Sequence, residues 1–313
     1  MKSLVIIETE NQQIKTSSAE AIFYGRQVSG TSGEVIALCL HSNDSSVLET
    51  CGNFGANKVL ALASPHKEGD IMITAEYVSQ IARDFAAEVI ILPRTSLNDA
   101  VAPRIAVKLQ AQVVSNVVGL PDFYNGFTVK RSIYTGKAFA EVTLTSPKKV
   151  LTIKKNILSV EKSNQKALVE ILSIPAIGSK VKLLERQKSE GKILLPEADK
   201  VVSGGRGLKG PENWGMIETL AQKIGAATAC SKPVSDANWR PHHEHVGQTG
   251  IKISPNLYIA IGISGAIQHL AGVSSSKTIV VINKDPEAPF FKVADYGIVG
   301  DAFEIVPKLN SLL

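Results

Sequence analysis

Two glycine-rich segments of the sequence have the composition of an anion-binding loop. Ser203–Gly207 holds three glycines, which allow close backbone approach, and Arg206, whose forked guanidinium could pair with a diphosphate. Gly262–His269 follows an apolar run and opens a helical pattern, so its first N–H groups could hold a phosphate. Its two glycines do not make the G-x-G-x-x-G fingerprint of dinucleotide-binding proteins. Each segment alone also fits an ordinary turn between a strand and a helix.

Two further places offer hydrogen-bonding groups next to predicted strands. Val246–Gly250 is a loop with hydroxyl and amide donors between glycines, although alone it is only a turn. Asn283 and Asp301 each follow an apolar run and could bind a ribose or an adenine, but Asp301 also suits the N-cap of the last helix. His269, in the first turn of a predicted helix, could also bind a ligand. A lone histidine is, however, more often a structural residue.

Other chemistries are poorly supported by the spacing of the candidate residues. His242–His245 contains zinc-ligand types, but adjacent residues cannot all face one ion and the H-E-x-x-H spacing is absent. A polar loop is the better interpretation of this run. The sequence also has no G-x-S-x-G nucleophile elbow, so it shows no hydrolase signature.

Composition narrows the class of protein further. The 313 residues are 44% hydrophobic and 20% charged, which suits a soluble protein of two domains. The net charge of +5 comes from 34 basic and 29 acidic residues without dense basic runs, so a nucleic-acid partner is not expected. Cys39, Cys51 and Cys230 form no C-x-x-C pair, which favours reduced thiols in a bacterial cytoplasm. The chain enters an apolar strand at Ser3–Ile7, and we expect no transit peptide and no membrane insertion.

The first part of the chain alternates predicted strands and helices, which is typical of a parallel sheet with crossover helices. The predicted strands are Leu4–Glu8, Val35–Leu40, Lys58–Leu62 and Glu88–Leu92, and the helices include Ser17–Val28 and Thr74–Phe85. Between Val113 and Lys154 the pattern predicts an antiparallel appendage, with a turn at Tyr134–Gly136. Its strands would be Phe127–Ile133, Lys137–Leu144 and Val150–Lys154.

A polar stretch near residue 190 predicts the boundary between two domains. We expect an N-terminal α/β domain at 1–187, a linker at 188–199 and a C-terminal domain at 200–313. The C-terminal domain is predicted as a doubly wound, Rossmann-like sheet, in which ligands bind at the carboxyl ends of the strands. Its strands would be Lys200–Val202, Leu257–Ile261, Thr278–Ile282 and Tyr296–Val299, with helices Glu212–Ile224, Ala266–Ala271 and Ala302–Leu312.

Four ordered blocks in this domain resemble the alpha subunit of electron-transfer flavoproteins. The blocks are Val246–Gly250, Leu257–Gly272, Ile282–Pro289 and Ala294–Val299. The C-terminal domain resembles the family over nearly its whole length, whereas the N-terminal domain matches in pattern and size. The resemblance implies that the C-terminal domain binds FAD and that the nucleotide-binding-like N-terminal domain packs on a beta subunit that carries AMP.

The resemblance also implies roles for residues. Arg206 and Ser231 would contact the flavin side, Gln248 and Thr249 the isoalloxazine, with Thr249 near N5, and His269 the N1–C2=O edge. Asn283 and Asp301 would take the adenosine end. The full predicted FAD-binding set is Arg206, Ser231, Lys232, Val246, Gly247, Gln248, Thr249, Gly262, Ser264, Gly265, Ala266, Ile267, Gln268, His269, Asn283, Asp301 and Ala302.

One position departs from the family pattern. Arginine usually follows the serine at the position of Ser231, whereas this chain has Lys232 and then Pro233. Lysine keeps the charge but loses the planar fork that stacks on a ring, which affects redox tuning more than flavin binding.

The function implied is electron transfer, one electron at a time, without a small-molecule substrate of the chain's own. Donors would be flavin dehydrogenases such as the acyl-CoA dehydrogenases of fatty acid beta-oxidation, and the acceptor a membrane quinone oxidoreductase. The alternatives are an electron-bifurcating member of the family, a flavin or nicotinamide oxidoreductase acting on a metabolite, and an adenine-nucleotide module without a redox role.

Overall fold

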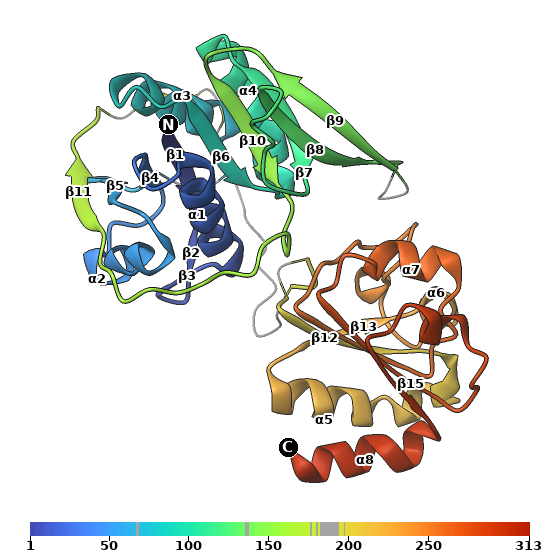
Figure 1. Ribbon diagram of the computed structural model, residues 1–313. Helices are drawn as coiled ribbons and strands as arrows, with labels where there is room; N and C mark the ends of the chain where they lie inside the picture. The colour runs from blue at the N-terminus through green and yellow to red at the C-terminus, as the bar shows by residue number, and fades with distance from the viewer. Residues whose placement is uncertain (67–68, 135–137, 176, 180, 182–193, 197) are drawn as a thin grey trace. The chain divides into compact units, whose positions relative to one another are not determined.

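The computed structural model describes residues 1–66, 69–134, 138–175, 177–179, 181, 194–196 and 198–313. The chain divides into two compact units, Met1–Arg186 and Gln187–Leu313, both drawn in Figure 1. Most of the predicted linker, 188–199, lies outside the described residues, so the domain limits 1–187 and 200–313 stay predictions. Leu195 and Ala198 are described, and both are buried in the core of the second unit.

The first unit is built on one large sheet, which has nine strands in the part of the chain that the structure describes. In spatial order they are β11 (Leu168–Leu172), β5 (Lys58–Leu62), β4 (Glu34–Cys39), β1 (Lys2–Ile7), β6 (Val89–Pro93), β10 (Lys149–Ile153), β7 (Gln112–Val117), β8 (Phe127–Ile133) and β9 (Ala138–Leu144). Pairing is parallel from β11 to β7 and antiparallel from β7 to β9. The predicted parallel sheet with an antiparallel appendage is therefore confirmed.

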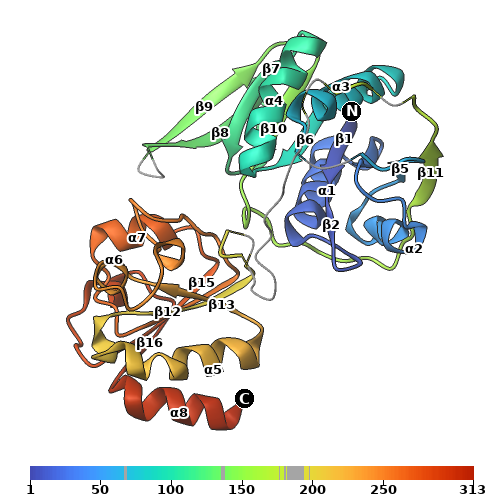
Figure 2. The same cartoon turned by 180° about the vertical axis from the view of Figure 1, so that it is seen from behind.

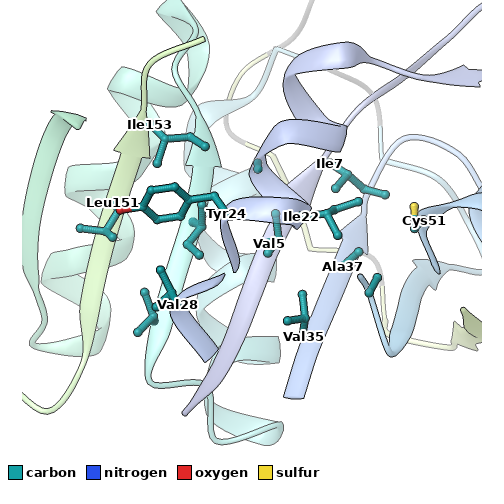
Figure 3. Packing of buried hydrophobic residues seen from close by; sticks show 14 of the residues in the cluster. Val5, Ile7, Ile22, Tyr24, Val28, Val35, Ala37, Cys51, Leu151 and Ile153 are labelled. Carbon is teal, nitrogen blue, oxygen red and sulfur yellow. The ribbon is translucent and has the colours of Figure 1, made fainter. Parts of the chain in front are cut away.

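Helices cover both faces of this sheet, which explains why its central strands are apolar along their whole length. Alternate residues of one strand enter opposite cores, since Val5 packs on the face of α1 and Leu4 on the face of α3 and α4. Figure 3 shows Ile22 and Tyr24 of α1 among strand residues on the first of these faces. The helices of this unit are α1 (Thr16–Ser29), α2 (Ser45–Leu48), α3 (Ile71–Asp84) and α4 (Ser96–Leu109), with the 3-10 turn η1 (Glu49–Phe54) and the short pair β2 (Thr9–Glu10) and β3 (Gln13–Ile14).

The prediction that Val150–Lys154 belongs to the antiparallel appendage is wrong. Strand β10 lies between β6 and β7 and runs parallel to both, and only β8 and β9 form the hairpin. Because β10 is covered on both faces, four of its five residues are buried, which is the pattern of a central parallel strand. Part of the predicted turn Tyr134–Gly136, residues 135 and 136, lies outside the described residues.

The second unit has a five-stranded parallel sheet within the described ranges. Its spatial order is β13 (Ala227–Cys230), β12 (Lys200–Gly204), β14 (Leu257–Ile261), β15 (Thr278–Asn283) and β16 (Tyr296–Val299). The first strand along the chain, β12, lies between the second and the third, so the chain reverses its winding direction between β12 and β14. In doubly wound sheets such a switch point, at the carboxyl ends of the strands, is where ligands bind.

Helices again lie on both faces of this smaller sheet. The chain forms α5 (Gly215–Ile224), α6 (Lys232–Asp236), α7 (Ile267–Val273) and α8 (Ala302–Leu312), with 3-10 turns η3 (Arg206–Leu208), η4 (Pro211–Asn213), η5 (His242–Glu244) and η6 (Pro289–Lys292). In Figures 1 and 2, α5 and α8 run side by side along one face and α7 covers the other. The sequence did not predict β13 or α6, although α6 begins at the candidate residue Lys232.

Candidate functional site

The two glycine-rich loops predicted from the sequence meet at the switch point between β12 and β14. Gly205 N donates to Ile261 O at 2.9 Å, and Gly207 N donates to Gly262 O at 3.0 Å. A Cβ atom at Gly205 would lie 2.2 Å from Gly262 O, and one at Gly207 would lie 2.6 Å from Gly262 Cα. The loops can therefore approach only because these positions have no side chain, and together they present backbone to a ligand.

The segment after β14 leaves small and polar residues facing solvent. Gly262 and Gly265 have φ angles of +63° and +82°, which glycine adopts at low cost, and Gly265 packs against the backbone of Phe290. The residues between Gly265 and His269, together with Ser264, are exposed; they are Ser264, Ala266, Ile267 and Gln268. The turn therefore exposes most of the predicted phosphate-binding residues.

The predicted loop Val246–Gly250 lies against this same segment. Gln248 N donates to Gln268 O at 2.7 Å, and a Cβ atom at Gly272 would meet Gly247 N at 2.5 Å. Val246 and Gly247 are buried, while Gln248 and Thr249 are exposed. The structure thus joins the second and third predicted segments, which are 12 residues apart in the sequence, and leaves the two predicted flavin contacts accessible.

Ser231 and Lys232 follow β13, next to the first glycine loop. Ser231 N donates to Gly204 O at 3.1 Å, and Ser231 is the buried N-cap residue of α6. Lys232 is exposed. The structure therefore places the predicted serine and lysine at the carboxyl end of the strand that neighbours β12.

The polar loop after α6 is anchored by an ion pair between the partly buried Arg240 and the buried Glu244. Arg240 Nε donates to Glu244 Oε2 at 2.8 Å and Arg240 Nη2 to Glu244 Oε1 at 2.6 Å. The guanidinium also lies 5.2 Å from the centroid of the Trp214 ring and pairs with Glu218. Glu244 of the run His242–His245 is therefore committed to an arginine, and no group of possible metal ligands occurs among the described residues.

Asn283 and Asp301 lie at the carboxyl ends of β15 and β16, but their side chains bind the backbone of their own surroundings. Asn283 Nδ2 donates to Ile263 O at 3.0 Å, and Asp301 Oδ1 accepts from Phe303 N at 2.9 Å as the N-cap of α8. Ala302 follows as the buried first residue of that helix. The geometry thus shows the capping alternative for Asp301 and a link between two strand-end loops for Asn283, and contact of either residue with adenosine remains a prediction.

His269 is buried, and its surroundings keep it neutral. Its Nε2 lies 2.7 Å from the hydroxyl of Tyr258 on β14, and its Nδ1 is buried without a partner among the described residues. Burial, assisted by the charge of nearby His245, lowers the pKa of His269 to about 4. At neutral pH His269 can therefore contribute a hydrogen bond to a ligand but not a positive charge. The sequence did not single out Tyr258.

The buried imidazole predicts a loss of stability in acid. The pKa of His269 falls from 6.5 to about 4 on folding, so between these values the unfolded chain binds more protons and stability rises with pH. The contribution is fully present above about pH 6.5 and is lost as the pH falls towards 4. Between pH 7 and pH 5 this one residue should cost about 2 kcal/mol.

Urea unfolding at the two pH values measures this loss. The variant His269→Gln should lose about 2 kcal/mol less than the natural chain, whereas His243→Gln, which alters an exposed histidine, should lose as much as the natural chain. Equal losses in all three proteins would contradict the assignment to His269.

The residues brought together suit a flavin dinucleotide. Gly205, Gly207 and Gly262 let the two loops touch backbone to backbone, exposed hydroxyl and amide groups lie on the neighbouring segments, and one buried ring nitrogen, His269 Nδ1, has no hydrogen-bond partner among the described residues. An exposed turn of backbone and small residues suits a pyrophosphate, and an unpaired ring nitrogen can hydrogen-bond to a polar group of a ligand. No helix in the described ranges is both long and apolar enough to cross a membrane.

Comparison with known proteins shows the family to which both units belong. The chain matches the electron transfer flavoprotein domain over residues 3–176 and the electron transfer flavoprotein FAD-binding domain over residues 194–274. Both units thus belong to the class of electron-transfer flavoproteins. The chain is 37% identical to the electron transfer flavoprotein subunit alpha of Bacillus subtilis, covering 99% of this chain and 96% of the relative.

Relatives from two other organisms give the same result. Identity is 36% to the subunit alpha of Pseudomonas aeruginosa, over 99% of both chains, and 35% to the probable mitochondrial subunit alpha of Caenorhabditis elegans, over 99% of this chain and 93% of the relative. The chain belongs to the family of electron-transfer flavoprotein alpha subunits, and the resemblance seen in the sequence is confirmed.

Proposed function

We propose that this chain binds one FAD at the carboxyl edge of its C-terminal sheet and, paired with a beta subunit, carries electrons between other proteins. The observation that supports this most is the convergence of the segments Ser203–Gly207, Val246–Gly250 and Gly262–His269 on one switch point. The first segment lies far from the other two in the sequence, and side-chain-free positions allow the loops to meet. A dinucleotide needs such an extended surface of backbone and small residues.

The chain's own residues would bind and orient the cofactor. Gly205, Gly207 and Gly262 let the two loops meet, so that their backbone would face the pyrophosphate, with Ser264, Gly265, Ala266 and Gln268 around the phosphates and ribityl chain. Arg206, Ser231, Lys232, Gln248 and Thr249 would surround the flavin, and Asn283 and Asp301 the adenosine. Bound FAD would supply the one-electron redox chemistry.

His269 would act on the flavin as a neutral donor. Reduction places negative charge around N1 and C2=O, and a fixed N–H group aimed at that edge stabilises it. Since burial lowers the pKa of His269 to about 4, this donor keeps the same charge across the physiological range. The cations of the predicted set are Lys232 and Arg206, and both are exposed.

The partners proposed follow from the family. A beta subunit carrying AMP would pack on the N-terminal unit, flavin dehydrogenases such as acyl-CoA dehydrogenases would donate electrons, and a membrane quinone oxidoreductase would accept them. The chain would act in the cytoplasm as a carrier without a substrate of its own. Its three cysteines are buried and unpaired, in keeping with a reducing compartment.

Coexpression with a candidate beta subunit tests this function. We expect a yellow heterodimer that releases one FAD per alpha subunit on denaturation and is reduced by an acyl-CoA substrate only when its dehydrogenase is present. Direct reduction by NADH would instead indicate the bifurcating type. A colourless heterodimer that releases AMP alone would contradict the proposal and favour a nucleotide-binding module.

A further inference from the structure

A buried phenol and a buried imidazole form a polar pair inside the apolar core beneath the site. Tyr258 is fully buried and His269 is 7% exposed. Their neighbours are apolar: the Phe290 ring stacks on Tyr258 at 6.2 Å and meets His269 edge-on at 5.7 Å between centroids. Polar groups in such a core are costly unless they are paired, so the one hydrogen bond between them, at 2.7 Å, needs a reason.

Counting the hydrogen-bonding groups decides which of the two side chains donates. If the Tyr258 hydroxyl donates to His269 Nε2, only one buried group, the Nδ1–H of His269, lacks a partner. If Nε2–H donates instead, both the phenol hydrogen and the bare Nδ1 lack one. Each buried unpaired group costs about 1–3 kcal/mol, so the first arrangement is favoured.

The surroundings of Tyr258 offer the phenol hydrogen no better acceptor. Ser203 on β12 lies on the same face of the sheet, because Val201 pairs with Tyr258 and Ser203 with Ala260. Its hydroxyl has no hydrogen-bond partner of acceptable geometry among the described residues. Burial raises the pKa of Tyr258 above its usual range and outweighs the opposing influence of nearby Ser203, so the phenol keeps its hydrogen. The hydrogen therefore points to His269.

We propose that Tyr258 is a positioning residue that holds His269 as the Nδ1–H tautomer, with the unpaired Nδ1–H left to donate to the ligand. The inference rests on the proposed function, since the acceptor would be the carbonyl edge of a bound flavin. An imidazole without a partner in water favours the Nε2–H tautomer, which would turn a lone pair towards that carbonyl. Tyr258 reverses this preference, because the nitrogen that accepts from the phenol cannot carry the hydrogen.

Nitrogen NMR of the heterodimer reads the tautomer directly. The alpha chain is labelled with ¹⁵N-histidine, and the resonances of its six histidines are assigned with His269→Gln and the matching surface variants. In the natural protein we expect Nδ1 of His269 to show the shift of a protonated ring nitrogen and Nε2 that of an unprotonated one. In Tyr258→Phe, which keeps the stacked ring, the two shifts should exchange or average.

The flavin potential supplies the second measurement. In Tyr258→Phe the reduced flavin should lose stability about tenfold relative to the oxidised form, a fall of about 59 mV for one electron. Ser203→Ala is the matched control, since it removes a buried hydroxyl on the same sheet face. It should leave both the tautomer and the potential unchanged, whereas a phenol that donates to Ser203 would make this variant shift them.

Two results would overturn the assignment. One is an Nε2–H tautomer at His269 in the natural protein. The other is a folded, FAD-loaded Tyr258→Phe heterodimer in which tautomer and potential are unchanged. Loss of the proposed function is a separate outcome, because a heterodimer that binds no flavin can still show the Nδ1–H tautomer.

Discussion

Gly205→Ala should weaken FAD binding about 100-fold or more, which corresponds to about 2.7 kcal/mol. The new Cβ would lie 2.2 Å from Gly262 O and 2.7 Å from Gly262 C, so backbone and not a flexible side chain must move. Gly262 O also accepts from Gly207 N at 3.0 Å, and moving it would separate the two loops. Backbone strain is not the cause, since the φ of Gly205, −116°, is allowed for any residue.

A control variant tests whether the weaker binding comes from this contact and not simply from replacing a glycine by alanine. A Cβ atom at Gly215, the first residue of α5, would meet no atom outside its own helix turn within 4 Å, so Gly215→Ala should bind FAD normally and melt within a few degrees of the natural protein. Equilibrium titration of flavin fluorescence and a melting curve would be recorded for both variants. Normal FAD affinity in Gly205→Ala would show that close contact of the two loops does not form the site.

Arg240→Ala should cost about 3–5 kcal/mol of unfolding free energy, because it leaves the carboxylate of Glu244 buried without its partner. The Glu244 side chain is only 5% exposed and accepts two hydrogen bonds from this arginine. The variant also removes the contact with the Trp214 ring. We expect FAD binding to weaken as well, since the anchored loop continues into His245, which forms a β-bridge with Cys230 beside the site.

An exposed pair and a double variant complete this experiment. Lys166, whose side chain is 81% exposed, pairs with Glu49, and Lys166→Ala should cost at most about 1 kcal/mol. Arg240→Met combined with Glu244→Leu should recover most of the stability, because no buried charge remains. Chemical unfolding gives all three values. A cost for Arg240→Ala as small as that for Lys166→Ala would contradict the role assigned to the buried pair.

Local patterns predicted the elements of the C-terminal unit well. Strands Leu257–Ile261 and Tyr296–Val299 and helix Ala302–Leu312 have the predicted limits, because an apolar run or a helical period ends at each in a glycine, a cap or a polar residue. Strand β13 was not predicted, because Ala227–Cys230 is short and three of its four residues have little preference for β-strands. Five-residue α6 is too short to show a helical period.

Contacts between distant segments could not be predicted from local patterns. Strand β10 follows the hairpin in the sequence, which suggested that it pairs with the hairpin. In the structure it pairs with β6 and β7, where both of its faces are buried. In the site, the glycine loops were recognised one by one, yet their contact through Gly205 and Gly262 depends on the register of β12 and β14. The hydrogen bond between Tyr258 and His269 likewise joins a strand to a helix. It could not be predicted from the sequence, because a tyrosine within a strand does not indicate its hydrogen-bond partner.

Strand β11 has a consequence for how the chain is made. Its parallel partner β5 ends at Leu62, and 105 residues separate it from Leu168, where β11 begins. At about 5–20 residues per second, a ribosome needs roughly 5–20 s to deliver that missing edge. Throughout that interval the nascent chain exposes the unpaired N–H and C=O groups of β5, and unpaired edges invite association with other strands. Translation speed across this stretch therefore sets how long the growing polypeptide is open to pairing with a wrong strand.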